Sequence, residues 1–94
     1  MALFLMFGKY SPDAIKTMSS ERTDAAVDLI GRYGGEAQAM YATLGPHDLV
    51  FAVDFPSSED AMKASVAISR MTGIGFVTAP AVTVEKFDEI MEDL

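Results

Sequence analysis

The sequence predicts an α+β fold in which one four-stranded sheet carries two main helices. Two observations predict it. Strand-like and helix-like segments alternate in the order β-α-β-β-α-β, with an extra helix at the C-terminal end. Glycine or proline stands at most of the boundaries, as expected of turns and helix ends. This order is that of a ferredoxin-like sandwich, and right-handed crossovers place both main helices on the same sheet face. The 94 residues form a single domain, 1–94.

The first half of the chain begins with a strand over residues 2–10, an apolar run that ends in Lys9-Tyr10. Ser11 and Pro12 then indicate a helix start, with serine as the cap and proline at the first helical position. Ser19-Ser20 is expected to break this helix and to cap a second one over 21–33. Gly34-Gly35 ends the second helix.

The second half begins with strands over 36–44 and 48–55, joined by a turn at Gly45-Pro46. Ser57 caps a helix that is expected to reach Thr72. The apolar face of this helix consists of four residues: Ala61, Ala64, Ile68 and Met71.

The fourth strand is expected over residues 75–82 at an edge of the sheet. Pro80 fits an edge, because proline lacks the N–H that an inner strand needs. Thr83 then caps the C-terminal helix. Its apolar stripe consists of four residues at helical spacing: Phe87, Ile90, Met91 and Leu94.

The composition excludes several classes of protein. The net charge is −7, which argues against nucleic acid and anionic membranes as partners, because phosphate groups attract Lys and Arg. The chain has no Cys and one His, so disulfides and an all-protein metal site are not expected, and no cofactor is predicted. Half of the residues are apolar, which favours oligomerisation in a chain with so large a surface-to-volume ratio.

The N-terminal run over residues 1–7 is apolar, as a targeting signal would be. It lacks the basic start and the length of a signal peptide, and a membrane helix needs about 20 apolar residues. Because the run stops at Gly8-Lys9, a buried strand is the better interpretation. We therefore expect a cytoplasmic protein.

Both faces of the predicted sheet are apolar. On the third strand, large residues from Leu49 to Phe55 share one face, which we assign to the helices. The other face has Val50 and Ala52 in the middle. On a monomer it would be a contiguous exposed patch. We expect a homodimer or higher oligomer, packed sheet to sheet around a cavity, with residues 83–94 over the rim.

Three segments carry a family resemblance: residues 8–12 (Gly-Lys-Tyr-Ser-Pro), Gly34-Gly35, and residues 41–48 (Tyr-Ala-Thr-Leu-Gly-Pro-His-Asp). Through them the whole chain resembles the GYD-domain family, whose name comes from a Gly, Tyr, Asp signature at this hairpin. Gly45 and Asp48 match the signature, while His47 stands where Tyr is usual. The resemblance implies the dimeric α+β barrel superfamily, and it implies no particular activity.

His47-Asp48 has two interpretations. As a general-base pair, the histidine would exchange protons near neutral pH and the aspartate would orient it. However, adjacent residues on an extended strand point to opposite faces. We therefore favour a hairpin corner, in which Pro46 fixes one backbone angle and Asp48 accepts N–H bonds of the turn.

Three further residues are candidates for binding a ligand. Asp54 is on the same strand face as Asp48, and in an apolar cavity its carboxyl group could act as an acid or base. Tyr10 and Tyr41 could each offer a hydroxyl at an apolar pocket wall. Lys9 and Tyr10 must face opposite sides of the sheet, and the sequence does not decide which faces the cavity.

Three functions are compatible with these patterns. The first is a homo-oligomeric barrel that binds a small, mostly apolar molecule. The second is a cofactor-independent isomerase or monooxygenase, which rests on fold analogy alone. The third is an assembly module without a ligand.

Overall fold

Four strands and four helices make up the structure, a computed structural model that describes all residues from 1 to 94. In chain order they are β1 (Ala2–Tyr10), α1 (Pro12–Lys16), α2 (Ser20–Arg32), β2 (Glu36–Ala42), β3 (Leu49–Phe55), α3 (Ser58–Thr72), β4 (Ile74–Ala81) and α4 (Val84–Met91). Every predicted element is present. The largest boundary difference is in the last helix: its predicted apolar stripe reached Leu94, whereas α4 ends at Met91 and Leu94 is 97% exposed. Strand β2 ends two residues earlier than expected.

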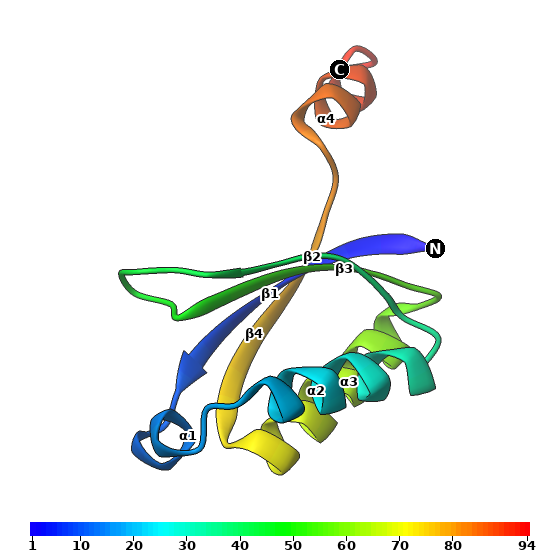
Figure 1. Cartoon of the computed structure of the whole chain (residues 1–94). Helices are drawn as coiled ribbons and strands as arrows, with labels where there is room; N and C mark the ends of the chain where they lie inside the picture. The colour runs from blue at the N-terminus through cyan, green and yellow to red at the C-terminus, as the bar shows by residue number, and fades with distance from the viewer.

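The strands form one antiparallel sheet in the order β2-β3-β1-β4. Helices α2 and α3 lie side by side under one face of this sheet, whereas α4 stands on the opposite side (Figure 1). The predicted ferredoxin-like arrangement with an extra C-terminal helix is therefore confirmed. Strand β4 is an edge strand, as Pro80 indicated.

Serine or threonine caps each helix, which explains why the helix starts are readable from the sequence. The hydroxyl oxygens of Ser11, Ser19, Ser57 and Thr83 each accept a hydrogen bond from a backbone N–H in the first turn. Such bonds connect residues three apart, so a short stretch of sequence is enough to specify them.

The two glycines after α2 have different roles. Gly34 has φ of 77°, the left-handed conformation that ends a helix. Gly35 provides space instead, because a Cβ atom there would lie 2.5 Å from the Phe55 ring and 2.7 Å from Ile30. Both glycines were predicted to be a helix stop, and the close approach of helix to sheet at Gly35 was not predicted.

The core lies between the sheet and the two main helices. Phe51, Val53 and Phe55 of β3 are buried there, which confirms the face assigned to this strand. The Phe4 and Phe55 rings pack edge to face, with their centroids 5.9 Å apart. The helices contribute small or branched residues to the core: Ala26, Ile30, Ala61, Ala64 and Ile68.

The last turn of α3 differs from expectation. Met71, assigned to the apolar face, is exposed, and Thr72 is buried. The Thr72 hydroxyl donates to the Ile68 carbonyl at 2.7 Å and accepts from the Ile74 N–H at 3.1 Å. These two bonds connect the end of α3 to the start of β4. The buried Thr72 hydroxyl therefore keeps its hydrogen-bond partners.

Strand β2 has a β-bulge at Gln38. Ala37 pairs with Val53 and Ala39 pairs with Ala52, which leaves Gln38 as the extra residue. Because of the bulge, the odd-numbered Ala37 faces the helices before it and the even-numbered Met40 faces them after it. This change explains the loose alternation of apolar residues in the sequence of β2. The Gln38 side chain donates to the Asp54 carboxylate at 2.7 Å.

The sheet face opposite α2 and α3 is called the open face here. Cross-strand pairing sets its members in rows: Leu3 with Ala81, Leu5 with Ala52, Ala39 and Ala79, and Phe7 with Val50, Tyr41 and Val77. It is more apolar than β3 alone indicated, because β1 adds leucine and phenylalanine side chains. In this single chain Val77 is 65% exposed and Tyr41 is 61% exposed.

No residue of α4 is buried. In Figure 1 the helix stands clear of the sheet of its own chain. None of the helices has the length and apolar character required to cross a bilayer.

Candidate functional site

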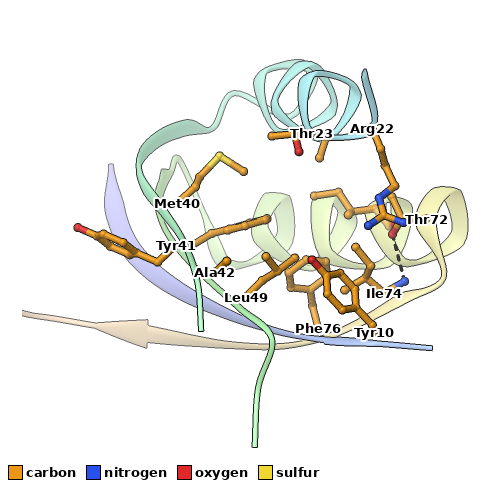
Figure 2. A pocket seen from close by; sticks show the side chains of 13 residues that line it. Tyr10, Arg22, Thr23, Met40, Tyr41, Ala42, Leu49, Thr72, Ile74 and Phe76 are labelled. Atoms are coloured by element: carbon orange, nitrogen blue, oxygen red, sulfur yellow. Dashed lines mark hydrogen bonds between the residues drawn. The ribbon is translucent and has the colours of Figure 1, made fainter. Parts of the chain in front are cut away.

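An apolar cavity lies between the sheet and α2, on the side of the sheet away from the open face. It holds about 200 Å³, and 10 of its 13 lining residues are hydrophobic. Met40, Phe51 and Ile68 line it together with Ile74 and Phe76. Figure 2 shows side chains from α2 above and from the sheet below converging on this space.

Polar groups gather where Tyr10 and Arg22 line the cavity. The Arg22 guanidinium lies over the Tyr10 ring, with its central carbon 5.5 Å from the ring centroid. The same guanidinium donates to the Ala14 carbonyl and, at 3.1 Å, to the Thr17 hydroxyl. A cation is therefore held at a mostly apolar cavity, as in sites that orient a ligand with one polar end.

Tyr10 is the predicted site residue whose ring lines this cavity. It has the same strand parity as the buried residues of β1, so Lys9 faces the other side. Tyr41 contributes to the cavity wall, but its ring points away from the cavity (Figure 2). The Tyr41 hydroxyl is therefore presented on the open-face side.

Asp48 and Asp54 are not brought together. Asp48 directly precedes β3 and Asp54 lies near its far end, six residues later, which corresponds to roughly 20 Å. Asp54 is at the end of the open face, where Gln38 donates to it. Neither carboxylate is among the residues that line the cavity.

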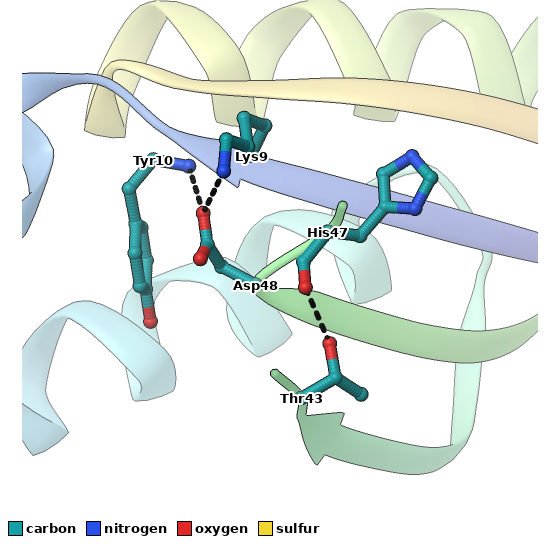
Figure 3. Close-up of polar contacts among 5 residues, drawn as sticks. All are labelled: Lys9, Tyr10, Thr43, His47 and Asp48. Carbon is teal, nitrogen blue, oxygen red and sulfur yellow. Dashed lines mark hydrogen bonds and ion pairs between the residues drawn. The ribbon is translucent and has the colours of Figure 1, made fainter. Parts of the chain in front are cut away.

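His47 packs its ring against Phe7 on the open-face side, with 5.1 Å between the ring centroids. Its carbonyl oxygen accepts from the Thr43 hydroxyl at 2.7 Å, which closes the hairpin loop. No hydrogen bond joins the imidazole to Asp48, and the two side chains diverge in Figure 3. The pair is thus arranged as a corner and not as a base with its orienting acid.

Asp48 ties the hairpin to the central strand. Its carboxylate accepts the Tyr10 backbone N–H at 2.8 Å and lies 3.7 Å from the Lys9 ammonium (Figure 3). Its own N–H donates to the Gly8 carbonyl at 2.8 Å. The aspartate does bind a backbone amide, but one 38 residues away rather than one of its own turn.

The comparisons with known proteins place the chain in a family. A family model described as the GYD domain matches residues 4–91. The chain belongs to the GYD-domain family. No match was found among the curated proteins.

Solved structures share the fold of this GYD domain. The leucine response regulatory protein LrpA of Mycobacterium tuberculosis matches with a TM-score of 0.57 and 11% identity, covering 87% of this chain and 51% of that one. A second solved chain, described only as a point mutant, matches with the same TM-score and identity over 87% of this chain and 50% of its own. This chain thus spans about half the length of these two proteins.

Arg22 is the site residue that sequence reasoning missed. It lies one helical turn before Ala26 and two turns before Ile30, both of which are buried. A cation in line with the buried face of a helix is unusual, because that face is otherwise apolar. The helical spacing of Arg22 could therefore have predicted a polar group beside the core.

The corner role of Asp48 in the GYD domain is testable. We expect Asp48→Ala to lower the free energy of unfolding by about 1–2 kcal/mol, because the Tyr10 amide loses a charged acceptor. His47→Tyr, one residue earlier, is the comparison variant, and it should leave the unfolding free energy nearly unchanged. Urea denaturation of both variants measures this difference. Equal stability of the two would contradict the tie to β1.

Proposed function

We propose that this GYD-family chain is a homo-oligomeric module that binds a small, mostly apolar molecule. The observation that carries the proposal is the apolar cavity between the sheet and α2. Its walls are hydrophobic, and the polar groups of Tyr10 and Arg22 lie beside one another at it. This combination is typical of small-molecule sites, where apolar walls give affinity and a few polar groups give orientation.

The size of the cavity limits the ligand. About 200 Å³ is below the usual range for drug-sized ligands, which begins near ~300 Å³. A molecule with a single ring or a short branched chain would fit. Arg22 carries five N–H donors, so a ligand with a carboxylate at one end would be favoured over a neutral one of the same shape.

The open face supports the homo-oligomeric part of the proposal. Its central residues Leu5, Phe7 and Val50 form a contiguous apolar surface with Val77. A second copy packed on this face would remove that surface from water. The ligand cavity is on the other side of the sheet, so each copy would carry its own site.

The enzymatic alternative, an isomerase or monooxygenase, has less support. A proton-transfer reaction needs an acid or base within hydrogen-bond reach of the bound molecule. The cavity is lined by no Asp, Glu or His side chain. His47, Asp48 and Asp54 lie elsewhere, so the geometry favours binding over acid–base catalysis.

Titration with indole and benzoate, followed by methyl NMR, tests the binding proposal. The methyl groups of Met40, Ile68 and Ile74 should shift, and those of Leu5 and Val77 should not. Benzoate should bind more tightly than indole, because Arg22 can pair with its carboxylate. Shifts confined to the open face, or none at all with either probe, would contradict the proposed cavity.

A matched pair of variants strengthens the test. Ala26→Leu fills the cavity and should weaken benzoate binding by tenfold or more. Ala25→Leu makes the same chemical change one residue away, outside the lining, and should bind as the unaltered chain does. If Ala26→Leu does not fold, Thr23→Leu narrows the cavity from an exposed position and replaces it. Unchanged affinity in a folded blocking variant would contradict the site.

A further inference from the structure

The C-terminal helix α4 carries an apolar surface that its own chain does not cover. Phe87 is 51% exposed and Ile90 is 46% exposed, and they lie on one side of the helix with Met91. These three residues are called the α4 stripe here. A helix of eight residues is marginal in water without packing, so the stripe needs a surface to rest on.

The connector directs α4 away from its own sheet. Only Val82 and Thr83 separate β4 from α4, and two residues span about 7 Å at most. Thr83 is extended, with φ of −65° and ψ of 156°, and its hydroxyl accepts from the Lys86 N–H. Its carbonyl oxygen accepts from the Phe87 N–H at 2.9 Å. The cap therefore fixes the start of α4 at Thr83, two residues after the end of β4.

The direction in which α4 projects matches the open face. The helix stands on the side of the sheet opposite α2 and α3, which is the side that the open face looks onto (Figure 1). A second copy stacked on the open face would lie on this same side of the sheet, next to α4. The two uncovered apolar surfaces of the chain, the open face and the α4 stripe, would then be next to each other across the interface.

The charge of α4 argues against a membrane as its occupant. Away from the stripe the helix and the residues after it carry five acidic side chains and one lysine: Glu85, Lys86, Asp88, Glu89, Glu92 and Asp93. Helices that lie on membranes carry Lys and Arg on their polar face, because lipid surfaces are anionic. The apolar stripe of such a helix is suited to an apolar protein surface, such as the middle of the open face.

We propose that α4 is an exchanged arm, whose stripe packs on the open sheet face of a second copy of the chain. The proposal rests on the homo-oligomer proposed above and specifies how it is held together. Exchange is reciprocal in a twofold dimer, so each copy both gives an arm and receives one.

The absence of cysteine in the natural chain allows a direct test by disulfide crosslinking. One preparation carries Ile90→Cys in the stripe. A second, with a tag of different length, carries one cysteine on the open face, at Ala39, Ala52 or Val77 in turn. The two are mixed, allowed to exchange subunits and oxidised. A crosslinked band of mixed size is expected for at least one of the three positions.

Asp88→Cys is the control for the arm, because it lies on the polar side of α4 two residues from Ile90. It should give little or no mixed band. Crosslinks between two Ile90→Cys copies alone, or a disulfide within one chain that carries both cysteines, would overturn the exchange. So would equal mixed bands from Asp88→Cys and Ile90→Cys.

Sedimentation of the unaltered chain separates the two proposals. A dimer that yields no mixed band overturns the arm and leaves the homo-oligomer standing. A monomer overturns both.

Discussion

Phe51→Ala is expected to lower the free energy of unfolding by about 3–5 kcal/mol, the usual cost of removing a buried aromatic ring. Phe51 is 5% exposed, packs against Phe76 with ring centroids 5.4 Å apart, and forms part of the cavity wall. The loss is large because domains of this size are stable by only about 5–15 kcal/mol. The variant should therefore melt at a much lower temperature or fail to fold.

Leu44→Ala is the control for this prediction, because Leu44 is fully exposed at the tip of the hairpin. Denaturant unfolding of both variants is compared at one protein concentration, since the stability of an oligomer depends on concentration. A small change for Phe51→Ala, similar to that of Leu44→Ala, would contradict the assignment of this face of β3 to the core.

Val50→Asp is expected to dissociate the oligomer. Val50 lies in the middle of the open face, paired with Phe7 on one side and Tyr41 on the other. In a packed interface its carboxylate would be buried without a partner, at a cost of about 3 kcal/mol or more. That cost corresponds to a Kd of the oligomer that is raised by ~100-fold or more.

The comparison variant is Leu44→Asp, which adds the same charge at an exposed site. Circular dichroism shows whether each variant keeps its fold, and size-exclusion chromatography with light scattering gives its mass. A folded Val50→Asp protein with the same mass as Leu44→Asp at every concentration would contradict the open face as the interface.

The local parts of the fold were predictable, because their causes are local. The caps at Ser11, Ser19, Ser57 and Thr83 each join residues three apart, and they set the helix starts. Alternation along β3 likewise assigned Phe51 and its neighbours to the core. The element order then determined the sheet topology through the handedness of the crossovers.

Features that depend on distant contacts were not predictable in this way. The bulge at Gln38 exists only relative to β3, and the partner of Asp48 is an amide 38 residues away. Gly35 is required by the approach of Phe55, which no local pattern reveals.

The candidate site was predicted only in part for the same reason. The hairpin attracted attention through its single histidine, but the cavity is formed by parts of α2, α3 and all four strands. Tyr10 was named in advance, while Arg22 was not, because its role depends on stacking over a ring from another element. The side of the sheet on which Lys9 and Tyr10 each lie depends on the register of β1. The sequence does not specify this register, because large apolar residues lie on both faces of the strand.

Sedimentation equilibrium of the unaltered chain at micromolar concentration is the most direct measurement of the central claim, that the open face and the α4 stripe require a second copy. We expect a mass of at least twice that of one chain, maintained on dilution through the micromolar range. A single species with the mass of one chain, folded by circular dichroism and stable over days, would contradict it.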